Sequence, residues 1–237
     1  SNGGSLAFTA QPTFGFPSDL FLGTVAGTAP TRLGHSGSSA SGGGVFAGFR
    51  EPAVNEQGIV TVLAGIDTNG DSIEDTRAVY LFSSTGSPTL IADENGPFNF
   101  VNVLPRPAVN DAKVLAFVAG LDAGGYGIFT GADPVADKVI ATGDPLLGST
   151  TSSFEFSRFG LNDLGQIAFI AALADQREGV YRADPADRHI VTVTDGQVLD
   201  RLDFGNASLG GAAAIAGLAF EDSDGDGQLD ENEPLMA

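Results

Sequence analysis

The chain repeats one short phrase, in which an Asn and a glycine turn lead into an apolar strand that ends in Ala-Phe. The clearest copy is Asn162-Asp-Leu-Gly165-Gln-Ile-Ala168-Phe169, and Asn110-Asp-Ala-Lys113-Val-Leu-Ala116-Phe117 follows it closely. A third copy runs from Asn55 to Val62 and ends in Thr-Val, and weaker copies occupy Ser1–Phe8 and Ala213–Phe220. The copies begin at residues 1, 55, 110, 162 and 213, so the period is 51 to 55 residues. A period of this size indicates an array of similar units, because one such unit cannot bury its apolar face alone.

The composition favours short strands joined by tight turns. The 237 residues include 33 glycines and 42% apolar residues, and no long window keeps the apolar stripe of an amphipathic helix. Because the period continues to both ends, we expect one all-β repeat domain over residues 1–237, arranged as a β-propeller-like array. Its four-stranded units would cover about 1–54, 55–109, 110–161 and 162–212, with a half-unit at 213–237. An irregular open β-array would give the same signals.

The net charge limits the possible partners. Acidic residues outnumber basic ones by 30 to 11, giving a formal charge of −19, which repels nucleic acid and anionic membranes and favours cations. The chain has no cysteine, so disulfides and thiolate metal sites are excluded. No run of 18 apolar residues occurs, and we expect no membrane insertion.

Each unit is expected to contain four strands, and the phrase itself is expected to be structural. In the third unit the strands are predicted at Lys113–Leu121, Tyr126–Thr130, Lys138–Thr142 and Ser153–Phe159. The Asn suits the turn, and a Gly three residues later provides a positive φ before the strand. Lys113 replaces that Gly in the third copy, which suggests that the positive φ is not needed there. The alternating Ala and Phe place small and large side chains on facing layers.

The number of opening strands in the array differs from the number of complete units. The chain contains five opening strands but only four complete units, because residues 213–237 supply a first strand and then stop. An unpaired apolar edge invites pairing with another chain, and a head-to-tail contact that does not close generates filaments. We therefore expect the terminal strand of one copy to complete the sheet of a neighbour. A capped monomer, or a fragment of a longer chain, is the alternative.

The last acidic loop has the spacing of a twelve-residue Ca²⁺ loop. Oxygen ligands fall at loop positions 1, 3, 5, 7, 9 and 12, namely Asp222, Asp224, Asp226, the carbonyl of Gln228, Asp230 and Glu233. Gly227 at position 6 allows the sharp turn. Clustered carboxylates need a countercharge, which a hard divalent cation provides, whereas a solvated acidic tail is the alternative.

A second candidate Ca²⁺ loop lies between the first and second strands of the second unit. Its candidate ligands are Asp67, Asn69, Asp71, the carbonyl of Ile73, and Asp75. The spacing resembles the calcium hairpins of FG-GAP propellers, although Ser72 stands where those loops usually have Gly, and Ala78 at position 12 offers no carboxylate. The expected role of the ion is to fix the turn, and an ordinary polar hairpin is the alternative.

No catalytic motif emerges, and we expect neither an enzyme nor catalytic residues. The two histidines, His35 and His189, lie in a Gly/Ser-rich loop and on an alternating strand, and zinc-protease, P-loop and dinucleotide motifs are missing from the sequence. A glycosidase would need a carboxylate pair, which cannot be chosen among 30 acidic residues. The Ser/Thr-rich stretches 36–41 and 149–153 are interpreted as polar loops, and the sequon Asn206-Ala-Ser208 is a glycan acceptor if the protein is exported.

The whole period resembles the bacterial tandem NxxGxxAF repeat proteins with a choice of C-terminal surface anchors. Its second element is matched by Gly127-Ile-Phe129 and Gly179-Val-Tyr181, and the Gly143-Asp-Pro turn is also typical. The resemblance implies export and an extracellular or cell-surface location, and it carries no established chemistry.

These observations together predict a secreted or cell-surface structural protein that Ca²⁺ stabilises. We expect it to assemble with itself, head-to-tail, into extracellular filaments. A monomeric adhesin or glycan-binding propeller is the alternative, followed by a glycoside hydrolase.

Overall fold

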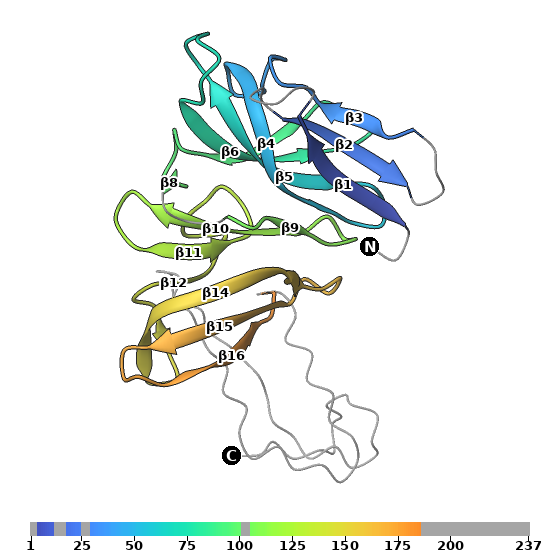
Figure 1. The fold of residues 1–237 in the computed structure, drawn as a ribbon. Helices are drawn as coiled ribbons and strands as arrows, with labels where there is room; N and C mark the ends of the chain where they lie inside the picture. Colours follow the sequence, from blue (N-terminus) through green and yellow to red (C-terminus); the bar gives the residue numbers. More distant parts are fainter. Residues whose placement is uncertain (1–3, 12–17, 25–28, 101–104, 186–237) are drawn as a thin grey trace, which may run out of the picture. The chain divides into compact units, whose positions relative to one another are not determined.

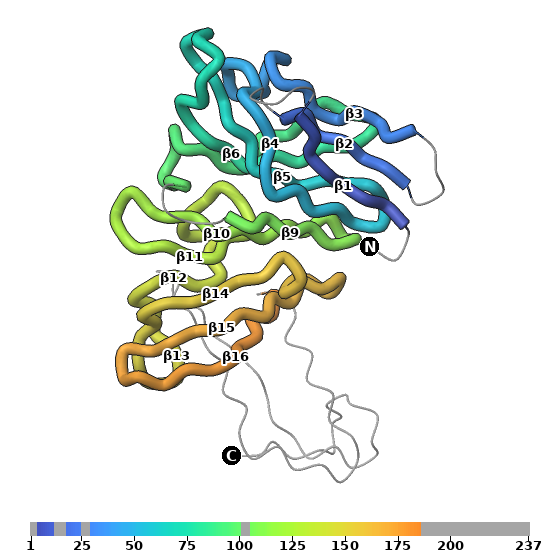
Figure 2. Tube along the Cα trace, in the orientation of Figure 1, coloured from blue at the N-terminus to red at the C-terminus, as the bar shows by residue number. Residues whose placement is uncertain are grey.

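The computed structural model describes residues 4–11, 18–24, 29–100 and 105–185 (Figures 1 and 2). All described strands pair antiparallel, and no helix occurs among the described residues. The expectation of an all-β chain is therefore confirmed for this part of the sequence. The described part accordingly contains no helix that could span a membrane.

The described strands form four sheets. The first contains β1 (Ser5–Ala10), β2 (Asp19–Thr24) and β3 (Thr31–Gly34), in that order. The second contains β4 (Val45–Val54), β5 (Val60–Asp67), β6 (Thr76–Phe82) and β7 (Thr89–Asp93). The third has the order β12 (Lys138–Ala141), β11 (Tyr126–Phe129), β10 (Leu115–Leu121) and β8 (Phe98–Asn99), and β9 (Ala108–Val109) also pairs with β10. The fourth contains β13 (Pro145–Leu146), β14 (Ser149–Leu161), β15 (Ile167–Leu173) and β16 (Glu178–Ala183).

The sheets divide the chain at different points from the sequence repeats. The strands that precede an Asn turn, β4 and β14, pair with β5 and β15, which follow it. The strand predicted at Ser153–Phe159 therefore lies in the fourth sheet, not with the strands of the third unit. The reason is local, since a short turn makes neighbouring strands antiparallel partners. Each Asn phrase is thus the turn of a β-hairpin.

The serine-rich stretch 149–153 is not a loop, as the sequence suggested, but the beginning of β14. Along this strand Thr151, Phe154 and Phe156 are buried, whereas the residues between them are mostly exposed. A strand that covers the core with one face tolerates Ser and Thr on the other. The composition of the exposed face concealed the strand.

The first sheet has one strand fewer than the second and fourth. The phrase strands β5 and β15 each lie between two partners, but β1 pairs with β2 alone. Among the described residues, no strand occupies the side of β1 that corresponds to β4 or β14. The expected four strands per unit are thus present in the second and fourth sheets and not in the first.

Three hydrophobic clusters join the successive sheets. Leu20 packs with Phe46 and Val62 between the first and second sheets. Leu63 and Val79 pack with residues of the third sheet, including Phe117 and Phe129. The third cluster joins the third sheet to the fourth and contains Val118, Ile128, Phe156 and Phe169. Every residue of β5 is buried because both faces of its sheet are covered.

The Ala-Phe ending of the phrase reflects these two covered faces. Ala116 and Phe117 point to opposite faces of β10 and belong to different clusters. The Phe, seven residues after the Asn, packs toward the preceding sheet, and the Ala packs toward the following one. The phrase therefore encodes a strand that is buried between two sheets.

Candidate functional site

The three described Asn turns share one hydrogen-bond pattern. In each, the Asn Oδ1 accepts from the backbone N–H four residues later, at 2.8, 2.8 and 2.9 Å for Ile59, Val114 and Gln166. The Asn carbonyl accepts from the N–H three residues later, which belongs to Gly58, Lys113 and Gly165. The Asn side chain thus replaces a backbone group in closing the turn.

The residue three positions after the Asn is left-handed in every described copy. Gly58 and Gly165 have φ values of 75° and 77°, and Lys113 has 64°. The expectation that Lys113 relaxes this requirement is therefore wrong. The turn demands the positive φ, and Lys113 adopts it against the steric preference of an L-residue.

The same Asn side chains also join one turn to the next. Asn55 Nδ2 donates to the carbonyl of Asn110 at 2.9 Å, and Asn110 Nδ2 donates to the carbonyl of Asn162 at 2.8 Å. Beside them, the N–H of Glu56 donates to Asp111, and the N–H of Asp111 donates to Asp163. Asn55 and Asn110 are each only 4% exposed. One buried amide therefore closes its own hairpin and also binds the hairpin of the next sheet.

The last described turn lacks this second connection. Asn162 is exposed, and its Nδ2 donates to Gln166 Oε1 within the same turn at 2.8 Å. The series of Asn links thus ends at an exposed amide that is satisfied locally.

A charged side chain four residues before each Asn forms further contacts between the hairpins, which the sequence did not lead us to expect. Arg106 donates to the carbonyl of Phe156 at 3.5 Å, and Arg158 donates to the carbonyl of Pro52 at 2.8 Å. Arg158 also forms an ion pair with Glu51. The sequence signal that could have revealed these contacts is a charged residue at the same place before each Asn, namely Glu51, Arg106 and Arg158. These contacts add polar links between hairpins of different sheets.

The candidate calcium loop at 67–75 is closed by its own hydrogen bonds. Asp67 is 3% exposed and accepts from the N–H groups of Gly70 at 2.6 Å and Ser72 at 2.8 Å. The hydrogen bond from Gly70 is the main reason that the pKa of Asp67 is lowered, because it stabilises the ionised form. Ser72 has a φ of 68°, at the position where Gly is usual in such loops.

The other candidate ligands of this loop bond to one another. Asn69 Oδ1 accepts from the N–H of Asp71 at 2.9 Å, and Asp71 Oδ1 accepts from the N–H of Ile73 at 2.8 Å. Asn69 Nδ2 donates to Asp75 at 3.0 Å. Within the described ranges, no three Asp, Glu or His side chains gather closely enough to hold a metal ion. The stronger sequence candidate, Asp222 to Glu233, lies outside the described residues.

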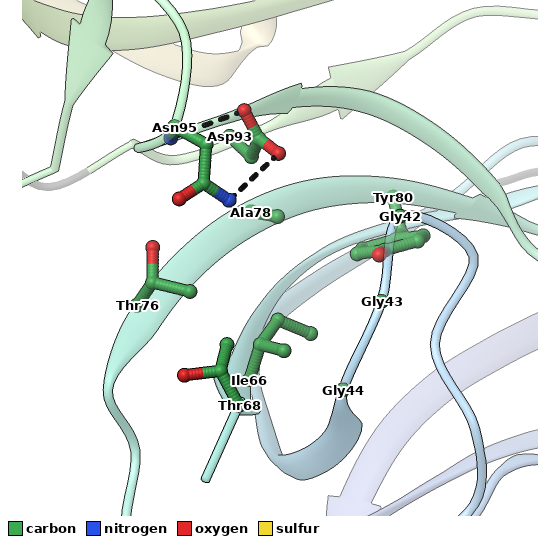
Figure 3. A pocket seen from close by; sticks show the side chains of 10 residues that line it. All are labelled: Gly42, Gly43, Gly44, Ile66, Thr68, Thr76, Ala78, Tyr80, Asp93 and Asn95. Atoms are coloured by element: carbon green, nitrogen blue, oxygen red, sulfur yellow. Dashed lines mark hydrogen bonds between the residues drawn. The ribbon is translucent and has the colours of Figure 1, made fainter.

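A small pocket lies next to this loop (Figure 3). Its volume is about 180 Å³, and its lining comprises Gly42, Gly43, Gly44, Ile66, Thr68, Thr76, Ala78, Tyr80, Asp93 and Asn95. Asp93 accepts from the backbone and side-chain nitrogens of Asn95, both at 3.2 Å. Burial raises the pKa of Tyr80, whose hydroxyl donates to the carbonyl of Ser41. No local sequence pattern indicates this pocket, because its residues come from four separate segments.

His35 lies in a hydrogen-bonded cluster around Asp19. Its Nδ1 lies 3.0 Å from Oδ1 of buried Asp19, which also accepts from the N–H and the hydroxyl of Ser36. Burial opposes ionisation of Asp19, but the hydrogen bonds from Ser36 and His35 outweigh it and lower the pKa. Because Ser36 donates to the Asp itself, these three residues do not form a nucleophile–base pair. His189 lies outside the described residues.

Comparison with protein families gives one match, to a family model described as a family of unknown function, DUF7453, over residues 93–233. Comparisons with curated proteins and with solved structures give no match. The matched segment contains the Asn110 and Asn162 turns and covers well over half of the chain.

Proposed function

The chain belongs to the DUF7453 family of unknown function, and we propose that it is a secreted or cell-surface structural protein that assembles head-to-tail into extracellular filaments. The family description names no activity, so the proposal rests on the residues of the chain. The observation that carries it is the free edge of β1.

The edge of β1 is the natural acceptor for an added strand. On the side where β5 has β4 and β15 has β14, the backbone N–H and C=O groups of Ser5–Ala10 have no strand partner among the described residues. An edge of this kind binds an extended segment through main-chain hydrogen bonds. One added strand would give this sheet the four strands of the second and fourth sheets.

The donor in this proposal is the terminal strand of a second copy, around the weak phrase copy Ala213–Phe220. The sequence supports this assignment because residues 213–220 repeat the apolar opening strand and end in Leu218-Ala219-Phe220. The resemblance to NxxGxxAF surface proteins supports export. A propeller-like arrangement of the sheets is part of the same proposal, since the period of 51 to 55 residues fits a four-stranded blade.

Assembly of the purified full chain tests the proposal directly. We expect light scattering to show masses that increase with concentration, and negative-stain images to show linear assemblies. Replacing Leu218 and Phe220 by Asp should leave monomers, because charged side chains weaken an apolar donor strand. The matched control is Val135→Asp, at a loop residue that is 61% exposed and lies in no strand. A wild-type chain that stays monodisperse at high concentration would refute the proposal.

Calcium is proposed to stabilise the loops at 67–75 and 222–233. Support comes from the alternating oxygen-bearing residues of both loops and from the charge of −19. At tenfold saturation, each bound ion would stabilise the fold by about 1.4 kcal/mol, enough to fix a turn. We expect EDTA to lower Tm and added CaCl₂ to restore it. Identical melting curves in EDTA and CaCl₂ would exclude the structural-calcium proposal.

The pocket beside Tyr80 favours glycan binding as a second candidate function. Asp93 and Asn95 in its lining offer the acceptor and donor groups that sugar hydroxyls require. Asp93 is the one carboxylate of the lining, whereas glycoside hydrolysis ordinarily uses two. A glycan array, repeated with Asp93→Asn, tests this candidate, and equal binding by both proteins would reject it.

A further inference from the structure

One cross-strand apolar pair recurs at the same place in successive sheets. Eight residues after the Asn, Leu63 pairs with Val79, Val118 pairs with Ile128, and Ile170 pairs with Val180. In the second and third sheets this pair belongs to the cluster shared with the following sheet. The pair therefore marks the face on which the next sheet packs.

The burial of this pair changes abruptly in the fourth sheet. The exposed fractions are 6% and 0% for Leu63 and Val79, and 8% and 0% for Val118 and Ile128. Ile170 is 39% exposed and its partner Val180 is 78% exposed. Among the described residues, no sheet covers this adjacent pair of β-branched side chains, which lies at a position that is otherwise an interface.

The first sheet carries the opposite kind of face, the one that in later sheets packs against the preceding sheet. The residues five and seven positions into the phrase pack toward the preceding sheet, as Leu115 and Phe117 do in β10 and Ile167 and Phe169 do in β15. The corresponding residues of β1 are Leu6, which is 58% exposed, and Phe8, which is partly buried. Phe8 stacks on Phe21 of β2 with ring centroids 5.5 Å apart, so the face is already ordered.

The described residue directly before β1 has the same backbone angle as its counterparts at the joined turns. Gly4 occupies the position of Gly58 and Gly165 and has a φ of 73°. The exposed amide of Asn162 is the donor that, in the two preceding turns, reaches the carbonyl of the next turn. The two ends therefore offer complementary apolar side chains, and Gly4 has the φ that the joined turns require.

We propose that the Ile170–Val180 face of one copy binds the Leu6–Phe8 face of a second copy. The contact repeats between two chains the packing that successive sheets make within one chain. It rests on the proposed head-to-tail assembly and names the surfaces that meet there. Leu6 and Val180 are both exposed in the same chain, so they do not cover each other within it.

Paired cysteines test this contact, because the natural chain has none. A chain with Leu6→Cys and Val180→Cys should form, under mild oxidation, a ladder of covalent multimers on non-reducing gels. The control is Val135→Cys with Val180→Cys, since Val135 lies on neither face and is 61% exposed. A disulfide within the monomer would overturn the proposal by showing closure within one chain. Multimers no more abundant than in the control would overturn it by showing that another segment, such as 213–220, covers the face.

A second experiment separates this inference from the assembly proposal. The Ile170→Asp, Val180→Asp double variant should keep the wild-type circular dichroism spectrum, because both side chains are exposed, and should lower the association constant at least about tenfold in light scattering. If the wild type assembles and the double variant assembles equally well, the contact is refuted and the filament proposal stands. If the wild type does not assemble, both proposals fail.

Discussion

The third and fourth sheets contain nearly the same hairpin in two different environments. Asn110 and the Val118–Ile128 pair are buried, whereas Asn162 and the Ile170–Val180 pair are exposed at equivalent positions. The local turn geometry is the same in both, down to the hydrogen bond from the fourth residue. The sheet beyond the phrase, more than the phrase itself, therefore determines how much each side chain stabilises the fold.

The largest expected difference concerns the apolar pair. Ile128→Ala should lower the free energy of unfolding by about 2–5 kcal/mol, since it leaves a cavity at a fully buried site. Val180→Ala should change it by less than about 0.5 kcal/mol in the monomer, because Val180 is 78% exposed. Urea denaturation below the concentration of any assembly measures both values. Equal effects of the two substitutions would contradict the assigned difference in burial.

The next largest difference in stability is expected between substitutions of Asn110 and Asn162. Asn110→Ala removes the bonds to Val114 and Asn162 from a buried position, and we expect a loss of about 2–3 kcal/mol. Asn162→Ala removes the bonds of an exposed side chain and should cost about 1 kcal/mol or less. Thermal and urea unfolding of the two variants provide the measurement. A cost at Asn162 as large as that at Asn110 would mean that the link to the next turn contributes nothing.

The interface between the second and third sheets also predicts a pH dependence. Burial opposes ionisation of Glu74, but its contacts with Arg50 and Arg77 outweigh this and lower its pKa. Arg77 donates in turn to the carbonyl of Phe100, at 3.0 Å. Because the folded pKa lies below the ordinary value of about 4.3, the ionised carboxylate stabilises the protein above that pH. This contribution is lost as the pH falls through the lowered pKa.

Glu74→Gln is the matched variant for this titration. We expect the stability difference between wild type and variant to be constant at neutral pH and to shrink below about pH 4. A difference that does not vary between pH 7 and pH 3 would exclude Glu74 as the cause.

The last comparison concerns the residue with positive φ in each turn. Lys113→Gly should stabilise the protein by about 0.5–1 kcal/mol, because Gly adopts the φ of 64° without strain. Gly165→Ala should destabilise it by about 1–2 kcal/mol, since its φ is 77° and the new Cβ would lie 3.1 Å from Pro185. Opposite signs in urea denaturation are expected. A destabilising Lys113→Gly would show that the lysine side chain contributes more than the backbone strain costs.

Much of the local structure could be predicted from the sequence. The all-β class, the Asn turns and the position of the 67–75 loop between two strands follow from Gly and Asn placement and from short apolar runs. The φ of Lys113 could not be predicted from the residue type, because the hydrogen bonds of the turn impose a positive φ even on a non-glycine residue. The β14 strand was obscured by Ser149–Ser153, since polar residues on an exposed face resemble those of a loop.

The candidate sites were harder to predict than the local structure, because they are formed by contacts between segments far apart in the sequence. The Asn55–Asn110 and Asn110–Asn162 bonds span 55 and 52 residues, and no local pattern announces that a side chain reaches the next turn. The pocket gathers Gly42, Tyr80 and Asp93 from three segments in the same way. The oxygen spacing of Asp67 to Asp75 was visible in the sequence, but which oxygens bond to backbone N–H groups was not.

By itself, the sequence determined the repeated hairpin, because backbone angles and strand alternation are set by residues close together in the chain. Tertiary structure alone decided that Asn110 is buried and Asn162 exposed, and that Val180 is open where Ile128 is covered. The physical reason is that burial depends on whether another sheet lies against a residue. Equivalent residues in equivalent turns can therefore differ in energy while their local conformation stays the same.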